Sequence, residues 1–138
     1  MFIKTIPVGS FQCNCTILGC EKSGEALIID PGDQAEDILA IVKKEGFRVK
    51  YLVHTHAHLD HIGVAGPLKR QGHGKIVLHR EDEFIYDSLE EQGRMFGLDL
   101  EPRDTVDHEI CHKDELEFGV HVLKVLHTPG HTPGSCSF

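Results

Sequence analysis

The chain has 138 residues, a length that fits one domain around one core and excludes a second full domain. Of these residues 40% are hydrophobic and 26% are charged, which is the composition of a folded globular protein. The formal net charge is −8 and the lysines and arginines are scattered, so a phosphate backbone finds no basic surface and we expect no nucleic acid partner. No apolar run has the length of a signal peptide or a membrane span, so we expect a cytoplasmic protein with no membrane partner.

The first predicted elements in chain order are a strand and a helix. Residues Ala26–Ile29 form a continuous apolar run that is stopped by Asp30-Pro31-Gly32, which indicates a buried strand entering a turn. Between Asp33 and Gly46 the apolar residues follow helical spacing. We expect Asp33 to be the N-cap of this helix and Gly46 to follow its C-terminus.

The middle of the chain continues the alternation of strands and helices. Tyr51–Val53 is predicted to be a second buried strand, which delivers the segment Thr55–His61 at its carboxyl end. Ile62–Gln71 is predicted to be helical, and Lys75–Leu78 is predicted to be a third strand. This order is typical of a sheet whose strands are connected by helices.

The last third of the chain is predicted to contain a helix, a loop and a strand. Glu81–Leu89 reads as a short acidic helix, whereas Glu90–Leu100 reads as a mobile surface loop that forms a flap beside the site, because glycines flank its central residues. A turn at Gly119 precedes an alternating strand over Val120–Val125, which runs into the segment His127–Gly134. No repeat or linker indicates a domain boundary.

Four side chains that can bind a metal ion lie within six residues, directly after the second of these strands. They are His56, His58, Asp60 and His61. In an extended or turning segment His56 and His58 point to the same side, while Asp60 and His61 enter the next helical turn and face a neighbouring position. One segment can therefore serve two adjacent metal positions.

A catalytic zinc ion takes three protein ligands, commonly histidines, and keeps one position open for water. The third histidine is predicted to be His131, because the prolines and glycines on both sides of it make a tight turn at the end of a strand. Zinc is favoured for such an imidazole-rich site, as one or two ions, and iron and manganese are alternatives.

Other residues near this motif have less specific patterns. Asp30, at the end of a strand, is expected either to accept a hydrogen bond from a ligand histidine or to cap its turn, and Thr55 is a similar case. Seven histidines complete no metal-spaced group and are left outside the site: His54, His73, His79, His108, His112, His121 and His127.

The chain has five cysteines and no CxxC pair. The odd count and the missing pairs argue against a disulfide framework and against a four-thiolate zinc site. Cys13 and Cys15 flank Asn14, but nothing in the sequence marks either as a reactive thiolate. We expect these cysteines to be reduced and to serve mostly in packing.

Together, three segments resemble the metallo-β-lactamase superfamily: Ala26–Gly32, Thr55–His61 and Thr128–Gly134. Within it, the chain is most similar to the glyoxalase II group, the hydroxyacylglutathione hydrolases, in the short bacterial form. The resemblance covers nearly the whole chain and implies an α+β fold, the αββα sandwich, with metal ions at its edge. Residues 1–138 would form one such domain, consisting mainly of the N-terminal half and the start of the second sheet.

The resemblance also implies the ligand set. His56, His58 and His131 would hold the first metal ion, and Asp60 and His61 the second. Relatives add a bridging aspartate and a last histidine, but Thr132–Phe138 contains neither. We therefore expect a chain truncated within the family fold, with an open sheet edge that favours self-association; a dimer that covers the edge and a mononuclear three-histidine site are the alternatives.

The chemistry implied for the complete enzyme is hydrolysis by metal-bound hydroxide, since a metal ion lowers the pKa of bound water to about 7. Asp60 would orient that water and is the predicted catalytic residue. A thioester such as S-2-hydroxyacylglutathione is a suitable small-molecule substrate. The alternatives are a sulfur (persulfide) dioxygenase or a lactonase or lactamase of the same superfamily, and a metal-binding fragment without turnover.

Overall fold

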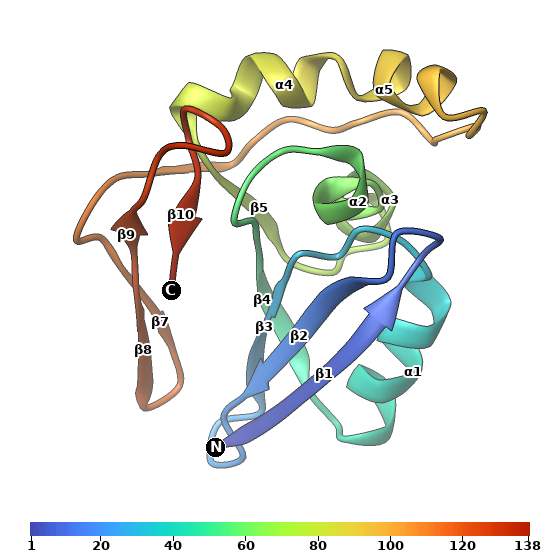
Figure 1. Cartoon of the computed structure of the whole chain (residues 1–138). Coiled ribbons are helices and arrows are strands. Elements are labelled where there is room, and N and C mark those ends of the chain that lie inside the picture. Colours follow the sequence, from blue (N-terminus) through green and yellow to red (C-terminus); the bar gives the residue numbers. More distant parts are fainter.

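A six-stranded mixed sheet runs through the centre of the computed structural model, which describes residues 1–138 (Figure 1). The strand order is β1-β2-β3-β4-β5-β6. β2 is antiparallel to both of its neighbours, β1 and β3, whereas β3 to β6 are parallel. The strands are β1 (Phe2–Val8), β2 (Cys13–Gly19), β3 (Glu25–Ile29), β4 (Arg48–Val53), β5 (Lys75–His79) and β6 (His108–Ile110).

Both faces of this sheet are covered. Helix α1 (Ala35–Lys44) buries Ile38 and Val42 against one face, where the larger hydrophobic cluster lies. On the other face Leu27 of β3 belongs to a second cluster with Phe118. Because neighbouring strand residues point to opposite faces, the continuous apolar runs predicted for β3, β4 and β5 supply both clusters.

The predicted N-cap of α1 is wrong by one residue. The helix begins after Gln34, which has a left-handed backbone with φ 56°. Asp33 instead accepts a hydrogen bond from the Gln34 N–H at its Oδ1, over 2.6 Å. Gly46 follows the helix with φ 72°, which confirms the predicted stop.

The helix expected over 62–71 is wrong in its extent, because two short helices occupy this region. They are α2 (Leu59–Ile62) and α3 (Ala65–Arg70). The Val64 N–H donates to the carbonyl of Pro31 over 3.2 Å, outside any helical pattern. A contact with the turn after β3 therefore interrupts the helical hydrogen bonding between α2 and α3.

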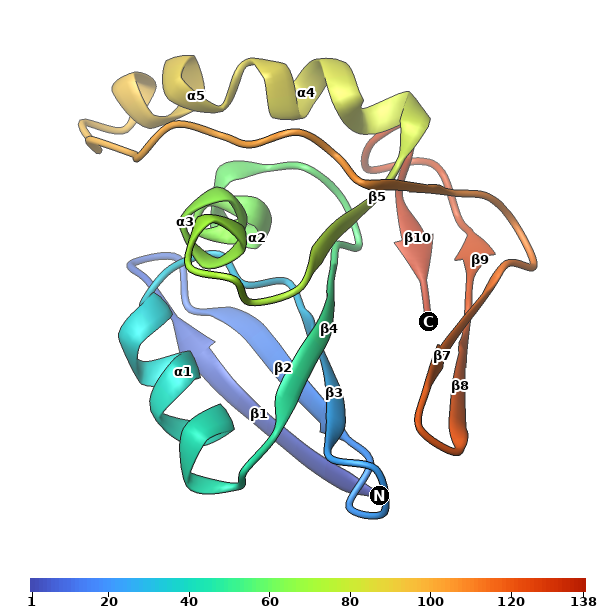
Figure 2. The ribbon, with the colours of Figure 1, turned by 180° about the vertical axis from the view of Figure 1, so that it is seen from behind.

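The segment after β5 is more helical than predicted. A 3₁₀ turn, η1 (Arg80–Asp82), leads into α4 (Glu83–Asp87) and α5 (Leu89–Met95). The expectation of a loop over 90–100 is therefore wrong for residues 90–95 and right for residues 96–100. The helix continues because Leu89 is buried and because Gly93 lets it approach Leu100, where an added Cβ would lie 2.9 Å from Cγ. Helices α4 and α5 lie across one end of the molecule, above α2 and α3 (Figures 1 and 2).

Two short antiparallel pairs lie beside the sheet on the side away from α1 (Figures 1 and 2). β7 (Glu115–Phe118) pairs with β8 (His121–Lys124), and β9 (Leu126–His127) pairs with β10 (Cys136–Ser137). The predicted turn at Gly119 is confirmed, although β8 is shorter than the predicted strand. Helices, the main sheet and these pairs form the expected α+β layers, and no helix has the length and apolar character to cross a bilayer.

Candidate metal centre

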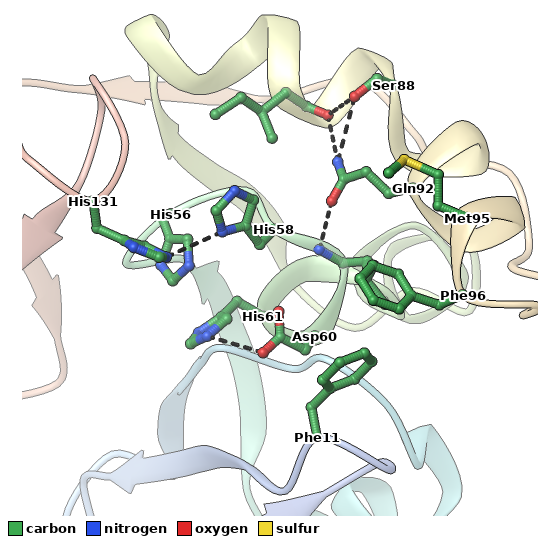
Figure 3. A pocket seen from close by; sticks show the side chains of 12 residues that line it. Phe11, His56, His58, Asp60, His61, Ser88, Gln92, Met95, Phe96 and His131 are labelled. Carbon is green, nitrogen blue, oxygen red and sulfur yellow. Dashed lines mark hydrogen bonds and ion pairs between the residues drawn. The ribbon is translucent and has the colours of Figure 1, made fainter.

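The candidate ligands lie at the carboxyl end of β4, where the chain turns over the edge of the parallel strands. The segment Thr55–His61 follows Val53, the last residue of β4, and leads into α2. His131 comes from the turn between β9 and β10 and lies beside His56 and His58 at the same side of the cavity (Figure 3). Sites at the carboxyl ends of parallel strands are common because several strand ends meet there.

The three predicted histidines of the first metal position converge. One ring nitrogen from each of His56, His58 and His131 lies within 4.8 Å of the other two, and His58 Nδ1 is 3.1 Å from His131 Nε2. His56 Nε2 is buried and has no hydrogen-bond partner. A buried lone pair without a donor fits a metal ion, and three imidazoles form a usual catalytic zinc set.

Hydrogen bonds determine which ring nitrogen of His56 carries the proton and which keeps its lone pair. The Thr55 hydroxyl donates to Asp30 Oδ2 over 2.7 Å and lies 3.0 Å from His56 Nδ1. Since a hydroxyl has one proton, Thr55 Oγ1 must accept from the Nδ1–H of His56. The lone pair is then on Nε2, which is the arrangement that ligand histidines adopt when the other ring nitrogen is anchored.

The second predicted pair also lies at the cavity. His61 Nε2 is 3.4 Å from Asp60 Oδ2, while His61 Nδ1 is 2.9 Å from Asp30 Oδ2. Asp30 therefore lies within hydrogen-bond distance of a candidate ligand histidine, which was one of the two alternatives expected from the sequence. It also accepts from the Thr55 N–H over 2.7 Å. Cys13 Sγ is 3.4 Å from His61 Nδ1, a neighbour that the sequence did not indicate.

His56 and His61 differ in charge. Burial lowers the pKa of His56 to about 4, and the neighbouring His61 contributes in the same direction. Burial acts to lower the pKa of His61 as well, but its hydrogen bonds to Asp30 and Cys13 raise it to about 10. His56 is thus neutral and ready to bind a metal ion, whereas a metal ion at His61 must first displace a proton.

The metal-free protein should lose stability below neutral pH because of His54. This side chain is fully buried, and burial lowers its pKa from 6.5 to about 4. The unfolded chain then binds this proton more readily, so the stability contributed by His54 is fully present above pH 6.5 and is lost as pH decreases toward 4. Between pH 7 and 5, His54 alone should remove about 2 kcal/mol of unfolding free energy.

Denaturant unfolding in the presence of a chelator, at pH 7 and pH 5, measures this loss. The variant His54→Gln has no imidazole to titrate there and should show a smaller pH dependence than the parent chain. Equal unfolding free energies at the two pH values for the parent chain would contradict the expected role of His54.

A cavity of about 450 Å³ opens beside the histidines. Its apolar walls come from the loop after β1, from α2 and from α4 and α5. Phe11 of that loop and Phe96, at the end of α5, contact each other edge to face, with ring centroids 5.2 Å apart (Figure 3). Gln92 reaches down from α5 and accepts from the Leu59 N–H over 2.9 Å. The predicted position of residues 90–100 beside the site is confirmed, whereas their mobility stays a prediction.

The structure groups two of the excluded histidines with Glu81 at a separate place. His79 and His127 stack with ring centroids 4.1 Å apart. However, His79 Nδ1 accepts from the Glu81 N–H, and His127 Nε2 lies 2.8 Å from the carbonyl of Pro133, to which it donates. The nitrogens nearest Glu81 Oε2 are these same two atoms, at 4.0 Å for His79 Nδ1 and 3.5 Å for His127 Nε2. Because both are already hydrogen-bonded, neither offers a free lone pair there, and this group remains outside the site.

Comparisons with known proteins identify the family. The model of the metallo-beta-lactamase superfamily matches residues 8–138, and the chain belongs to that superfamily, whose members are mostly metal-dependent hydrolases. The hydroxyacylglutathione hydrolase GloC of Haemophilus influenzae is 37% identical over 140 residues, which cover 100% of this chain and 66% of the relative. The chain spans about two thirds of the length of such curated relatives, 64 to 66%.

Two solved structures share the fold with the same TM-score and the same sequence identity. The BLEG-1 B3 metallo-beta-lactamase superposes with a TM-score of 0.83 at 30% identity, over 98% of this chain and 65% of its own. TTHA1623 in a di-iron-bound form has a TM-score of 0.83 at 30% identity, over 99% of this chain and 65% of its own. The expected metallo-β-lactamase fold is therefore confirmed.

Proposed function

We propose that this chain carries the metal site of a hydrolase that cleaves thioesters such as S-2-hydroxyacylglutathione. The observation that carries the proposal is the convergence of three histidine nitrogens on one wall of a cavity, with His56 Nε2 buried and unpartnered. The similarity to the hydroxyacylglutathione hydrolase of Haemophilus influenzae supports the substrate class.

His56, His58 and His131 would hold the first metal ion, and Asp60 and His61 would contribute to a second. When bound, zinc supplies a Lewis acid that polarises a carbonyl and lowers the pKa of water to about 7. Zinc is favoured by the imidazole-rich donor set, with iron as the alternative because TTHA1623 is described in a di-iron-bound form.

Asp60 is proposed as the catalytic carboxylate. It lines the cavity, and its Oδ2 lies beside His61 Nε2. From this position the carboxylate can accept a hydrogen bond from the attacking water and hold it toward the acyl carbon. The apolar wall formed by Phe11, Met95 and Phe96 would exclude bulk water from the acyl group.

One experiment separates this function from its rivals. The protein is purified, its metal content is measured, and hydrolysis of S-2-hydroxyacylglutathione is followed with added zinc and with a chelator. We expect hydrolysis that depends on the metal and is lost in Asp60→Asn, while His73→Ala, a change outside the cavity, leaves the rate unchanged.

Other outcomes identify other proteins. Oxygen consumption with a glutathione persulfide and bound iron would contradict the hydrolase and indicate a dioxygenase. Hydrolysis of a lactone or a lactam, without hydrolysis of the thioester, would indicate a different substrate class. Metal binding without turnover of any of these compounds would contradict the enzyme proposal and leave a metal-binding module.

A further inference from the structure

Asp82 is a buried carboxylate that contacts both segments that supply the three histidines. It ends the turn η1 after β5, and its side chain has no exposed surface. The sequence pattern placed it in an acidic helix and did not mark it as part of the site. Its environment is unusual for an aspartate, because such groups are rarely fully buried unless they are paired.

The two oxygens of Asp82 accept three hydrogen bonds. Oδ2 accepts from the Ala57 N–H over 3.1 Å and from the Thr132 hydroxyl over 2.7 Å, and Oδ1 accepts from the Gly134 N–H over 2.7 Å. Ala57 lies between His56 and His58, and Thr132 follows His131. One carboxylate thus joins two segments that are 75 residues apart, from Ala57 to Thr132.

The turn that holds His131 is built onto this carboxylate. The Thr132 N–H donates to Ser135 Oγ over 3.0 Å, and the Thr132 hydroxyl is 2.7 Å from the same atom. A Cβ added at Gly134 would lie 2.7 Å from Asp82 Oδ1, so only glycine lets the backbone approach so closely. His131 itself is exposed, and its position therefore depends on the anchoring of the turn.

We propose that Asp82 is a positioning residue that sets the distance between His131 and the pair His56 and His58, and thereby the affinity and geometry of the metal site. Asp30 anchors Thr55 and His61 on the other side of the same segment. The inference rests on the proposed three-histidine site but not on the proposed substrate. Partners that orient metal ligands in this way typically contribute 10- to 100-fold, as an order of magnitude, to metal affinity.

The test compares Asp82→Asn with the parent protein by zinc competition against a chelator. Asparagine keeps the shape but turns an N–H₂ group toward the Ala57 and Thr132 donors or the Gly134 donor. We expect the zinc Kd to rise roughly 10- to 100-fold, and the visible spectrum of the cobalt(II)-loaded protein to change. Asp107→Asn is the matched control, because Asp107 accepts from the Ile76 N–H on β5, away from the ligands.

A second pair of variants keeps the inference testable if Asp82→Asn fails to fold. Thr132→Val removes the hydroxyl that donates to Asp82, whereas Thr132→Ser keeps it. Weaker zinc binding in the valine variant, with recovery in the serine variant, supports the positioning role. The positioning role would be overturned if both Asp82→Asn and Thr132→Val kept the zinc affinity and the cobalt spectrum of the parent protein. If Asp82→Asn does not fold, the same result in Thr132→Val alone would overturn it.

These measurements are independent of the proposed reaction. If zinc affinity shifts as expected but no thioester is hydrolysed, the proposed function fails and the role of Asp82 stands. If the thioester is hydrolysed and zinc affinity is unchanged, the role of Asp82 fails and the proposed function stands.

Discussion

His131→Ala should prevent tight metal binding at the proposed first position and abolish the proposed metal-dependent hydrolysis. Three histidine nitrogens converge at the first metal position in the structure, and the substitution leaves only those of His56 and His58. Two ligands hold zinc far less well than three. We expect metal affinity to fall by more than about 100-fold, beyond the usual effect of removing an orienting partner. The unfolding free energy of the metal-free chain should change little, because His131 is exposed.

Metal content after dialysis and zinc competition measure this effect. His56→Ala should give the same loss of metal, whereas His73→Ala should retain both metal and activity. A His131→Ala protein that keeps the parent metal content would show that His131 is not a ligand and that the third donor comes from elsewhere.

Gly32→Ala should strongly destabilise the fold and displace Asp60 and His61. Gly32 follows β3 and packs against the backbone of α2, where an added Cβ would lie 1.6 Å from the carbonyl oxygen of Asp60 and 3.1 Å from the backbone nitrogen of His61. Two backbone segments must separate to accommodate it, since no side chain can move aside. We expect a loss of at least about 3 kcal/mol in unfolding free energy.

Denaturant unfolding of the metal-free protein tests this, with Gly46→Ala as the control. An added Cβ at Gly46 meets no atom within 4 Å, but φ is 72° there, so that variant should lose only about 1 to 2 kcal/mol from backbone strain. Equal losses in the two variants would mean that the turn after β3 yields easily and does not hold the Asp60 segment.

Local sequence patterns were sufficient to predict those features of the fold and of the candidate site that depend on a single segment of the chain. The candidate ligands His56, His58, Asp60 and His61 lie within six residues, so their chemistry and spacing are visible in the sequence alone. Strands β3 and β5 were predicted because a strand buried on both faces needs a continuous apolar run. By contrast, β1 was not predicted, since most of its residues are exposed and no apolar run marks it.

The sequence by itself indicated a candidate metal site, the alternation of the central strands with helices and the superfamily to which the chain belongs. Only the tertiary structure decided that α5 is a helix, that α2 and α3 are separate, and that Asp82 joins the two ligand segments. The physical reason is the range of the interactions. Asp82 bonds residues that are 25 and 50 positions away from it, and such contacts form only after the strands have brought distant segments together, so no local spacing reveals them.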